Sequence, residues 1–421
     1  MLPFWRANRG VCVQSSDPPP ERATHPALFL LLYLPFGAVS GYLVATLERF
    51  YMDAGVSLAA FGLLISLALS PHIFKVAWAP LVDTTLGLRR WYGLASAVIA
   101  AGIAATGFLT PGPAAMPMLT VLAVGASLAA TFSGMACESL MAHTTLPHRR
   151  GAAGGWSQAG SVGGAGLGGG AGLWLMSQLH SLALTGCIIG GVCALCSLAI
   201  VFAPSVIRPV RAVSYLKTLQ LVVKDCWSVG WTRAGLLTLL IFLLPLGSGG
   251  AANLFSGMSK DWHVSIDTLS KFTWVVGVST GLMALVGGFI CDRMDRKTAY
   301  CLFGVLEGVL ALGMALAPRT PEWFIVFAFA YSASIGLAYA AYAAVTLETI
   351  GAGAAATKWN LFASVSNIPV TIMPTVDGWA ATRFGPGGML QFEFWLALGA
   401  AALFATVSLA TRRRPALALA S

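Results

Sequence analysis

Charged residues are scarce in this sequence. Asp, Glu, Lys and Arg together make up 10% of the 421 residues, whereas hydrophobic residues make up 57%. An ordinary soluble domain carries roughly 25% charged residues. The low share of charged side chains here therefore argues against a water-soluble protein of this size. The formal net charge of +9 would suit a nucleic-acid partner in a soluble protein. Here the cations lie in short segments between apolar runs, which indicates orientation in a lipid bilayer and no nucleic acid.

Motifs for redox, metal and nucleotide chemistry are also lacking. Cys193 and Cys196 form a C-x-x-C without a partner pair inside an expected membrane helix, so we predict no metal and no cofactor. The stretches 164–169 and 277–281 match a dinucleotide fingerprint and a nucleophile elbow, but both lie in apolar helices without the strand those motifs need. No G-x-x-x-x-G-K-[ST] occurs, so ATP does not drive the protein directly. We find no convergent catalytic residues and predict that the chain is not an enzyme.

Long apolar stretches, by contrast, are abundant. The hydrocarbon core of a bilayer is ~30 Å thick and needs about 20 apolar residues per helix. This length predicts an all-α membrane protein with twelve transmembrane helices, at 27–47, 58–80, 91–110, 117–141, 151–176, 181–203, 234–257, 268–291, 299–317, 322–346, 358–377 and 389–411. The expected organisation is a cytosolic tail, a six-helix lobe, a cytosolic linker, a second six-helix lobe and a second cytosolic tail, at 1–26, 27–203, 204–233, 234–411 and 412–421.

The distribution of Lys and Arg predicts the orientation of these helices. With a cytosolic N-terminus, 19 of the 25 Lys and Arg residues lie in cytosolic segments, five lie in external loops, and Lys75 lies inside a span. Cytosolic segments of membrane proteins are enriched in these cations, so we expect both termini in the cytosol. The first 25 residues contain no apolar core that would predict a cleaved signal peptide.

Two loops half a chain apart share one pattern, an acid followed by cations. The acids are Asp83 and Asp292, separated by 209 residues. The cations are Arg89 and Arg90 in the first loop, and Arg293, Arg296 and Lys297 in the second. Such an offset is typical of a duplicated bundle, which indicates a two-lobed transporter. An acid at a helix end can accept hydrogen bonds from a neighbouring helix in one conformation and release them in another, so we predict gating loops; ordinary topogenic charge is the alternative.

These loops resemble the signature of the major facilitator superfamily. Within it, the chain resembles the AmpG-type permease group through Phe-Lys-Val-Ala-Trp-Ala-Pro-Leu-Val-Asp at 74–83, Arg-Gly-Ala at 150–152 and Gly-Gly-Ala-Gly-Leu-Trp-Leu at 169–175. The resemblance implies two pseudo-symmetric six-helix lobes around a central cavity in a bacterial inner membrane. It also implies import of a muropeptide-like sugar-peptide with protons. A siderophore or drug-like solute, which related short permeases handle, is the alternative.

Four ionisable side chains stand out inside the expected spans, where each is costly unless it is paired or faces water. His72 and Lys75 share one face of the second span, Glu138 lies in the fourth at a depth that Lys75 can reach, and Glu307 lies in the ninth. Proton coupling needs a carboxyl group that takes up and releases a proton, so we assign the four residues to it. Snorkelling of Lys75, an interfacial acid at Glu138 and a structural pair at Glu307 remain the alternatives.

The resemblance also implies which spans line the cavity, namely the first, fourth, seventh and tenth. On these spans we expect the substrate to meet Tyr33, Tyr42, Thr131, Asn253, Tyr331, Tyr339 and Tyr342. Aromatic and hydroxyl-bearing walls suit amphipathic or sugar-containing solutes. We therefore predict a monomeric secondary transporter whose partners are a small solute, a proton and the bilayer. A membrane-embedded enzyme or a non-transporting sensor is the alternative of another class; the first needs catalytic residues and the second a soluble domain, and we find neither.

Overall fold

The computed structural model describes residues 24–145, 150–204, 232–350 and 355–412, and the single positions 220 and 224. These residues form helices with short connections and no β-strand. The two tails and the linker expected from the sequence lie almost entirely outside the described residues. The side chains of Asp83 and Arg150 lie outside them as well.

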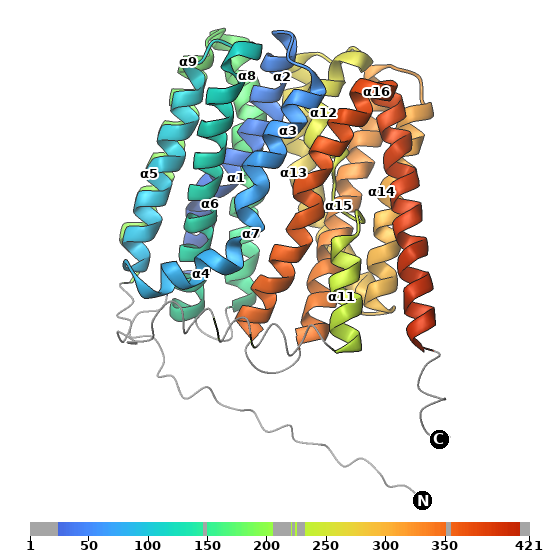
Figure 1. Cartoon of the computed structure of the whole chain (residues 1–421). Coiled ribbons are helices and arrows are strands. Elements are labelled where there is room, and N and C mark those ends of the chain that lie inside the picture. The colour runs from blue at the N-terminus through green and yellow to red at the C-terminus, as the bar shows by residue number, and fades with distance from the viewer. Residues whose placement is uncertain are drawn as a thin grey trace, which may run out of the picture.

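The first half of the chain forms helices that mostly run side by side through the molecule (Figure 1). They are α1 (Leu28–Gly41), α2 (Glu48–Asp53), α3 (Leu58–Leu69), α4 (Lys75–Thr84), α5 (Leu88–Gly107), α6 (Met116–Thr144), α7 (Arg150–Gly166), α8 (Gly172–Leu179) and α9 (Leu182–Ser197). Of these, α4 lies across the lower end in Figure 1. π-Helical turns at Tyr42–Leu47 and Leu167–Ala171 join α1 to α2 and α7 to α8. Each joined pair follows one expected span, the first and the fifth.

The second half continues this arrangement. Its helices are α11 (Arg233–Leu243), α12 (Phe255–Met258), α13 (Ile266–Cys291), α14 (Arg296–Leu316), α15 (Pro321–Ile350) and α16 (Ala355–Arg412). At Gly385 a left-handed φ of 73° bends α16 into a first arm, 355–384, and a second arm, 386–412, which run back to back as the last two expected spans. By length and composition, seven helical segments of the described chain could cross a membrane, and all expected spans overlap helices.

The seventh expected span is not one helix, contrary to the sequence prediction. The segment 244–250 lies between α11 and a short helical stretch that leads into α12. Pro245 has no amide to continue a helix, and Gly247 and Gly249 take left-handed φ values of 64° and 62°, which glycine tolerates. The break leaves backbone amides without helical partners inside the bundle, where other polar groups must satisfy them.

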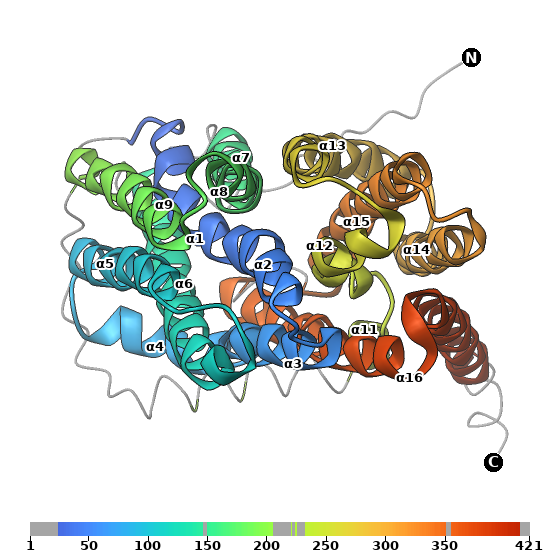
Figure 2. The same cartoon turned by 90° about the horizontal axis from the view of Figure 1, so that it is seen from above.

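The two halves of the chain pack against each other along two seams (Figure 2). One joins α3 to the first arm of α16, and the other joins α7 and α8 to α13. Glycine permits the first seam: a Cβ on Gly62 would overlap the backbone carbonyl of Pro374, and one on Gly378 would lie 2.8 Å from that of Leu58. Membrane helices approach each other closely at such small residues.

Candidate functional site

Three carboxyl groups converge on the broken segment 244–250. Glu307 lies on α14, Asp377 on the first arm of α16 and Glu393 on its second arm. Asp377 is 0% exposed, and Glu307 and Glu393 are 4% and 6% exposed. Only the tertiary fold brings these acids together, because they come from three separate helical segments.

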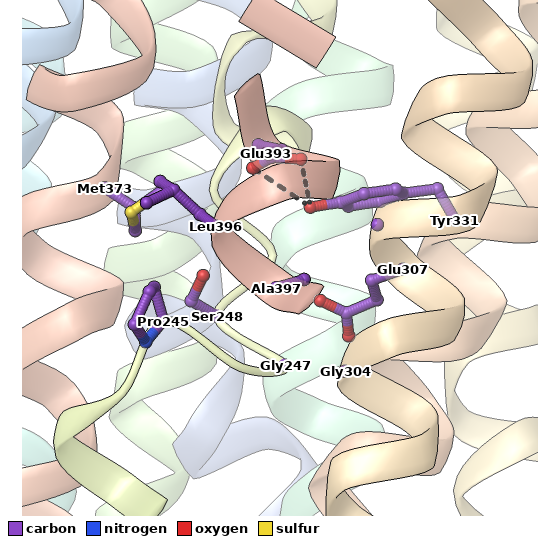
Figure 3. A pocket seen from close by; sticks show the side chains of 11 residues that line it. Pro245, Gly247, Ser248, Gly304, Glu307, Tyr331, Met373, Glu393, Leu396 and Ala397 are labelled. Carbon is purple, nitrogen blue, oxygen red and sulfur yellow. Dashed lines mark hydrogen bonds between the residues drawn. The ribbon is translucent and has the colours of Figure 1, made fainter. Parts of the chain in front are cut away.

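Hydrogen bonds from the broken segment and from α15 hold two of these acids. The Tyr331 hydroxyl donates to Glu393, with distances of 3.0 Å to Oε2 and 3.3 Å to Oε1 (Figure 3). The backbone N–H of Ala251 donates to Glu393 Oε1 at 2.7 Å, and that of Gly249 donates to Glu307 Oε2 at 3.3 Å. The break in the helix thus supplies the donors that the acids accept.

Asp377 lies beside Glu393 without donors of this kind. Neither of its carboxylate oxygens has a hydrogen-bond partner in the described part of the chain. A Cβ on Gly250 would overlap Asp377 Oδ2 and lie 2.8 Å from Glu393 Oε1, so both carboxyl groups point toward one position. None of the ion pairs between described residues involves either acid. We call Asp377 and Glu393 the carboxyl pair.

A small pocket lies beside the carboxyl pair. Glu307, Tyr331 and Glu393 line it, together with Ser248 of the broken segment (Figure 3). Its volume corresponds to about one water molecule. The pocket can hold water or a proton on one of its acids, but it cannot hold an organic solute.

In the first half, Lys75 and Glu138 form an ion pair between α4 and α6. Lys75 Nζ lies 2.6 Å from Glu138 Oε1, so the depth that the sequence suggested does bring the two together. Their side chains are 18% and 41% exposed, and Glu138 therefore reaches open space although it lies within a long apolar helix.

His72 contacts α6 rather than the ion pair. Its ring nitrogens lie 3.4 Å from Ser127 Oγ and 3.5 Å from Thr131 Oγ1, and its ring meets that of Phe36 edge-on at 5.9 Å. Thr131 is 1% exposed, so in this conformation it faces His72 and not an open wall.

In the second of the two loops predicted to act as gates, Arg296, Lys297 and Asp295 make contacts. Arg296 and Lys297 each lie 3.7 Å from a carboxylate oxygen of Glu348 on α15. Asp295 caps α14 by accepting a hydrogen bond from the backbone amide three residues later at 2.8 Å. Asp292, for which the sequence suggested such a contact, is exposed.

The remaining cations of the two loops make local contacts. The Arg293 guanidinium lies 3.3 Å above the ring of the Phe one turn before it. Arg89 reaches the backbone carbonyl of Val201 at 3.5 Å, and Arg90 is exposed. The side chain of Asp83 lies outside the described part of the structure.

The tyrosines on the expected cavity walls differ in accessibility. Tyr42 is 2% exposed, and its hydroxyl lies near Gly186 of α9, so it packs inside the first half of the chain. Tyr33 is buried, with its ring 6.0 Å from that of Phe36. Tyr339 is 62% exposed and is the most accessible of them.

The other residues expected on these walls belong to the second half. Tyr331 binds Glu393, and Tyr342 packs against Phe242 and Trp359 with ring centroids 5.0 and 5.9 Å away. Asn253 donates to the backbone carbonyl four residues earlier at 3.4 Å, next to the broken segment.

Polar contacts join the halves at the end of the bundle where α2 and α12 lie, the upper end in Figure 1. Arg49 donates to Ser259 Oγ at 2.7 Å, and Asp53 pairs with both Arg49 and Lys260. Glu48 is wholly buried against the α12 backbone. We call these contacts the upper junction.

Sequence reasoning missed the carboxyl pair. Asp377 is the last residue of one expected span and Glu393 stands near the start of the next, so each reads as an acid at a helix end. The structure extends both helices to Gly385 and so moves both acids into the bundle. One signal was available: the two acids lie eight residues on either side of Gly385, which puts them at one depth in an antiparallel helix pair.

Comparisons with known proteins agree with this architecture. The family model described as Major Facilitator Superfamily matches residues 237–420. The anhydromuropeptide permease of Escherichia coli strain K12 is 25% identical over 376 residues, which cover 85% of this chain and 74% of that protein.

Solved structures share the fold. The nucleoside transporter NupG superposes with a TM-score of 0.68 at 14% identity, covering 91% of this chain and 98% of that one. The xylose transporter XylE from E. coli, in a partially occluded inward-open conformation, superposes with a TM-score of 0.67 at 12% identity, covering 91% and 99%. These matches confirm the resemblance inferred from the sequence and the prediction that the chain is not an enzyme: it is a multi-pass membrane protein similar to transporters of the major facilitator superfamily, whose family model matches its second half.

Proposed function

We propose that the protein imports a muropeptide-like sugar-peptide across a bacterial inner membrane together with protons. The similarity to the anhydromuropeptide permease over 85% of the chain carries this proposal. Twelve spans form two lobes, 27–203 and 234–411, which alternate between outward-facing and inward-facing states. Both termini are cytosolic in this proposal, so the end of the bundle at which α16 ends, the lower end in Figure 1, faces the cytosol.

The contacts between the halves support an inward-facing assignment for this conformation. The upper junction closes the external end, because Arg49 and Asp53 connect α2 to Ser259 and Lys260 in the turn after α12. Toward the other end, the Glu138 side chain is 41% exposed. In this state a solute reaches the central cavity from the cytosolic side. We expect the exposed Tyr339 to line that cavity.

The ion pair of Lys75 and Glu138 controls the coupling in this proposal. Both residues lie on helices that must move during alternating access, so the contact can form in one state and break in the other. A Glu138 carboxylate without Lys75 then gains from taking up a proton. His72 supports α6 beside the pair.

The loops at Asp83 and Asp292 act as gates in this proposal. Asp292→Asn should slow turnover and leave substrate binding intact, and unchanged turnover would reduce that loop to topogenic charge.

Counterflow in proteoliposomes tests the substrate class. Vesicles loaded with unlabelled anhydromuropeptide should take up the labelled compound from outside, whereas vesicles loaded with a nucleoside or with xylose should not. Protein-free vesicles provide the background. Counterflow with xylose or a nucleoside but not with the anhydromuropeptide would overturn the assignment.

Reporter fusions test the proposed topology. A reporter after Ser421 should lie in the cytosol and one near Pro113 outside, and the same side for both would overturn the topology.

A further inference from the structure

No cationic side chain among the described residues pairs with the two acids of the carboxyl pair. Asp377 and Glu393 point toward the same position above Gly250, and Asp377 is wholly buried without a hydrogen-bond partner among the described residues. Two ionised carboxylates this close repel each other, and burial removes the water that would screen them. Some ligand of positive charge must compensate.

The surroundings contain donors but no compensating cation. On α14 the neighbour is Glu307, and on α15 it is Tyr331; Ala251, the residue just after the broken segment, contributes its amide. The adjacent α3 presents a hydroxyl, that of Ser66, which binds Thr375 two residues before Asp377. Ion pairs between described residues lie elsewhere. No facing group recorded on these elements is a Lys, Arg or His.

A proton fits the pair better than a metal ion. Asp377 and Glu393 are close enough to share one hydrogen bond once either carries a proton. The described residues contain no group of three or more His, Cys, Asp or Glu with the geometry to hold a metal ion. One O–H bond formed on one carboxyl group, donated to an oxygen of the other, removes the repulsion and satisfies Asp377.

The same site connects to the contacts between the halves. Glu393 accepts a hydrogen bond from the backbone amide of Ala251, at the start of the helical stretch that leads into α12. Ser256 lies five residues later, in α12 itself. The Ser256 hydroxyl donates to the backbone carbonyl of Ala45 in the first half at 2.6 Å. Loss of the proton changes the charge that the Ala251 amide faces, and this change acts on the segment that forms the upper junction.

We propose that Asp377 and Glu393 bind one exchangeable proton between them, and that residues 251–256, which follow the broken segment, link its uptake and release to opening of the upper junction. The water-sized pocket beside Glu307 is the route by which the proton reaches and leaves the pair. On release, the O–H bond breaks and the proton passes to water. The inference deepens the proposed proton coupling and rests on it for the link to transport.

Infrared spectroscopy tests the site without transport. A protonated carboxyl group has a carbonyl stretch that a carboxylate lacks, and purified protein in lipid at neutral pH should show it. Asp377→Asn and Glu393→Gln should each remove part of this band. The control Asp267→Asn, in an exposed ion pair with Lys271, should leave it unchanged. If a variant does not fold, labelling of the wild type by a hydrophobic carbodiimide, mapped by peptide mass, should fall on Asp377 or Glu393. Absence of the band in the wild type overturns the proposal, as does a band in both variants that equals that of the wild type. Carbodiimide labelling that spares both acids overturns it as well.

A transport measurement then separates this inference from the proposed function. Under an imposed gradient of one pH unit, one proton per solute supports about tenfold accumulation. Both variants should lose that accumulation and keep exchange of labelled solute. If the wild type itself does not respond to the gradient, the proposed proton coupling fails, while the infrared result still decides the proton site. If the wild type responds and both variants accumulate equally well, the link between the pair and transport is wrong.

Discussion

The two halves of the chain differ in the partners of the carboxyl groups inside the bundle. In the first half the carboxylate pairs with an ammonium group, whereas in the second half it accepts hydrogen bonds from a hydroxyl and from backbone amides. Glu138 lies 2.6 Å from Lys75 and is half-exposed. Glu393 accepts hydrogen bonds from a tyrosine hydroxyl and one backbone amide, whereas no described residue donates one to its neighbour Asp377. The charges of an ion pair compensate each other, whereas two carboxylates buried side by side repel each other. Under the two proposals above, the second half holds a proton and the first half has a contact that breaks when the lobes move.

The largest effect that would test this division is on coupling. Glu138→Gln removes an acid that can switch between pairing with Lys75 and carrying a proton, so accumulation driven by a pH gradient should vanish while solute exchange persists. Uptake and exchange are measured in the same proteoliposomes, with Asp267→Asn as the control. If Glu138→Gln still concentrates solute in response to the gradient, Glu138 is structural, and the second-half acids, including Glu307, carry the coupling alone.

A smaller effect on stability should distinguish the two kinds of acid. Lys75→Ala leaves Glu138 without its partner and should lower the unfolding free energy by about 1 to 3 kcal/mol. The double change Lys75→Ala with Glu138→Gln should recover much of this loss, since no unpaired charge remains. The exposed pair is the control, because Lys271→Ala should cost less than about 1 kcal/mol. Thermal unfolding in detergent measures all three, and a double variant less stable than Lys75→Ala would contradict the compensation.

A local steric change tests the second half. A Cβ on Gly250 overlaps the carboxyl pair, so Gly250→Ala should destabilise the protein by about 1 to 3 kcal/mol and reduce the protonated-carboxyl band. Gly281→Ala on α13 is the matched control, since a Cβ there meets no atom within 4 Å. Equal melting temperatures for the two variants would show that the pair does not occupy the position described.

Much of the fold was predictable because hydropathy and Lys and Arg placement are local signals that a membrane reads directly. The ion pair was within reach of the same reasoning, since Lys75 and Glu138 stand at matching depths in spans whose direction the sequence predicts. Asp377 and Glu393 were not assigned, because their proximity depends on the bend at Gly385 and on how far the two arms extend. The exposure of Tyr339 and the burial of Tyr42 also depend on helix rotation, which the near-uniform hydrophobicity of these spans does not fix.

The break between α11 and α12 teaches a related lesson. Pro245, Gly247 and Gly249 marked it in the sequence, yet an apolar segment of the expected length conceals such a break when hydropathy alone is considered. Discontinuous membrane helices often mark binding sites, because their free amides can bind charged groups. Here the amides of the break bind Glu307 and Glu393, so the break and the acids form one site.

The central claim, that this protein moves a proton together with its solute, can be measured most directly with a pH-sensitive dye inside proteoliposomes. With no initial pH gradient, external anhydromuropeptide should acidify the lumen when wild-type protein is present. This acidification should disappear in Glu393→Gln and persist in Asp267→Asn. Entry of labelled solute into wild-type vesicles without any luminal acidification would contradict the account.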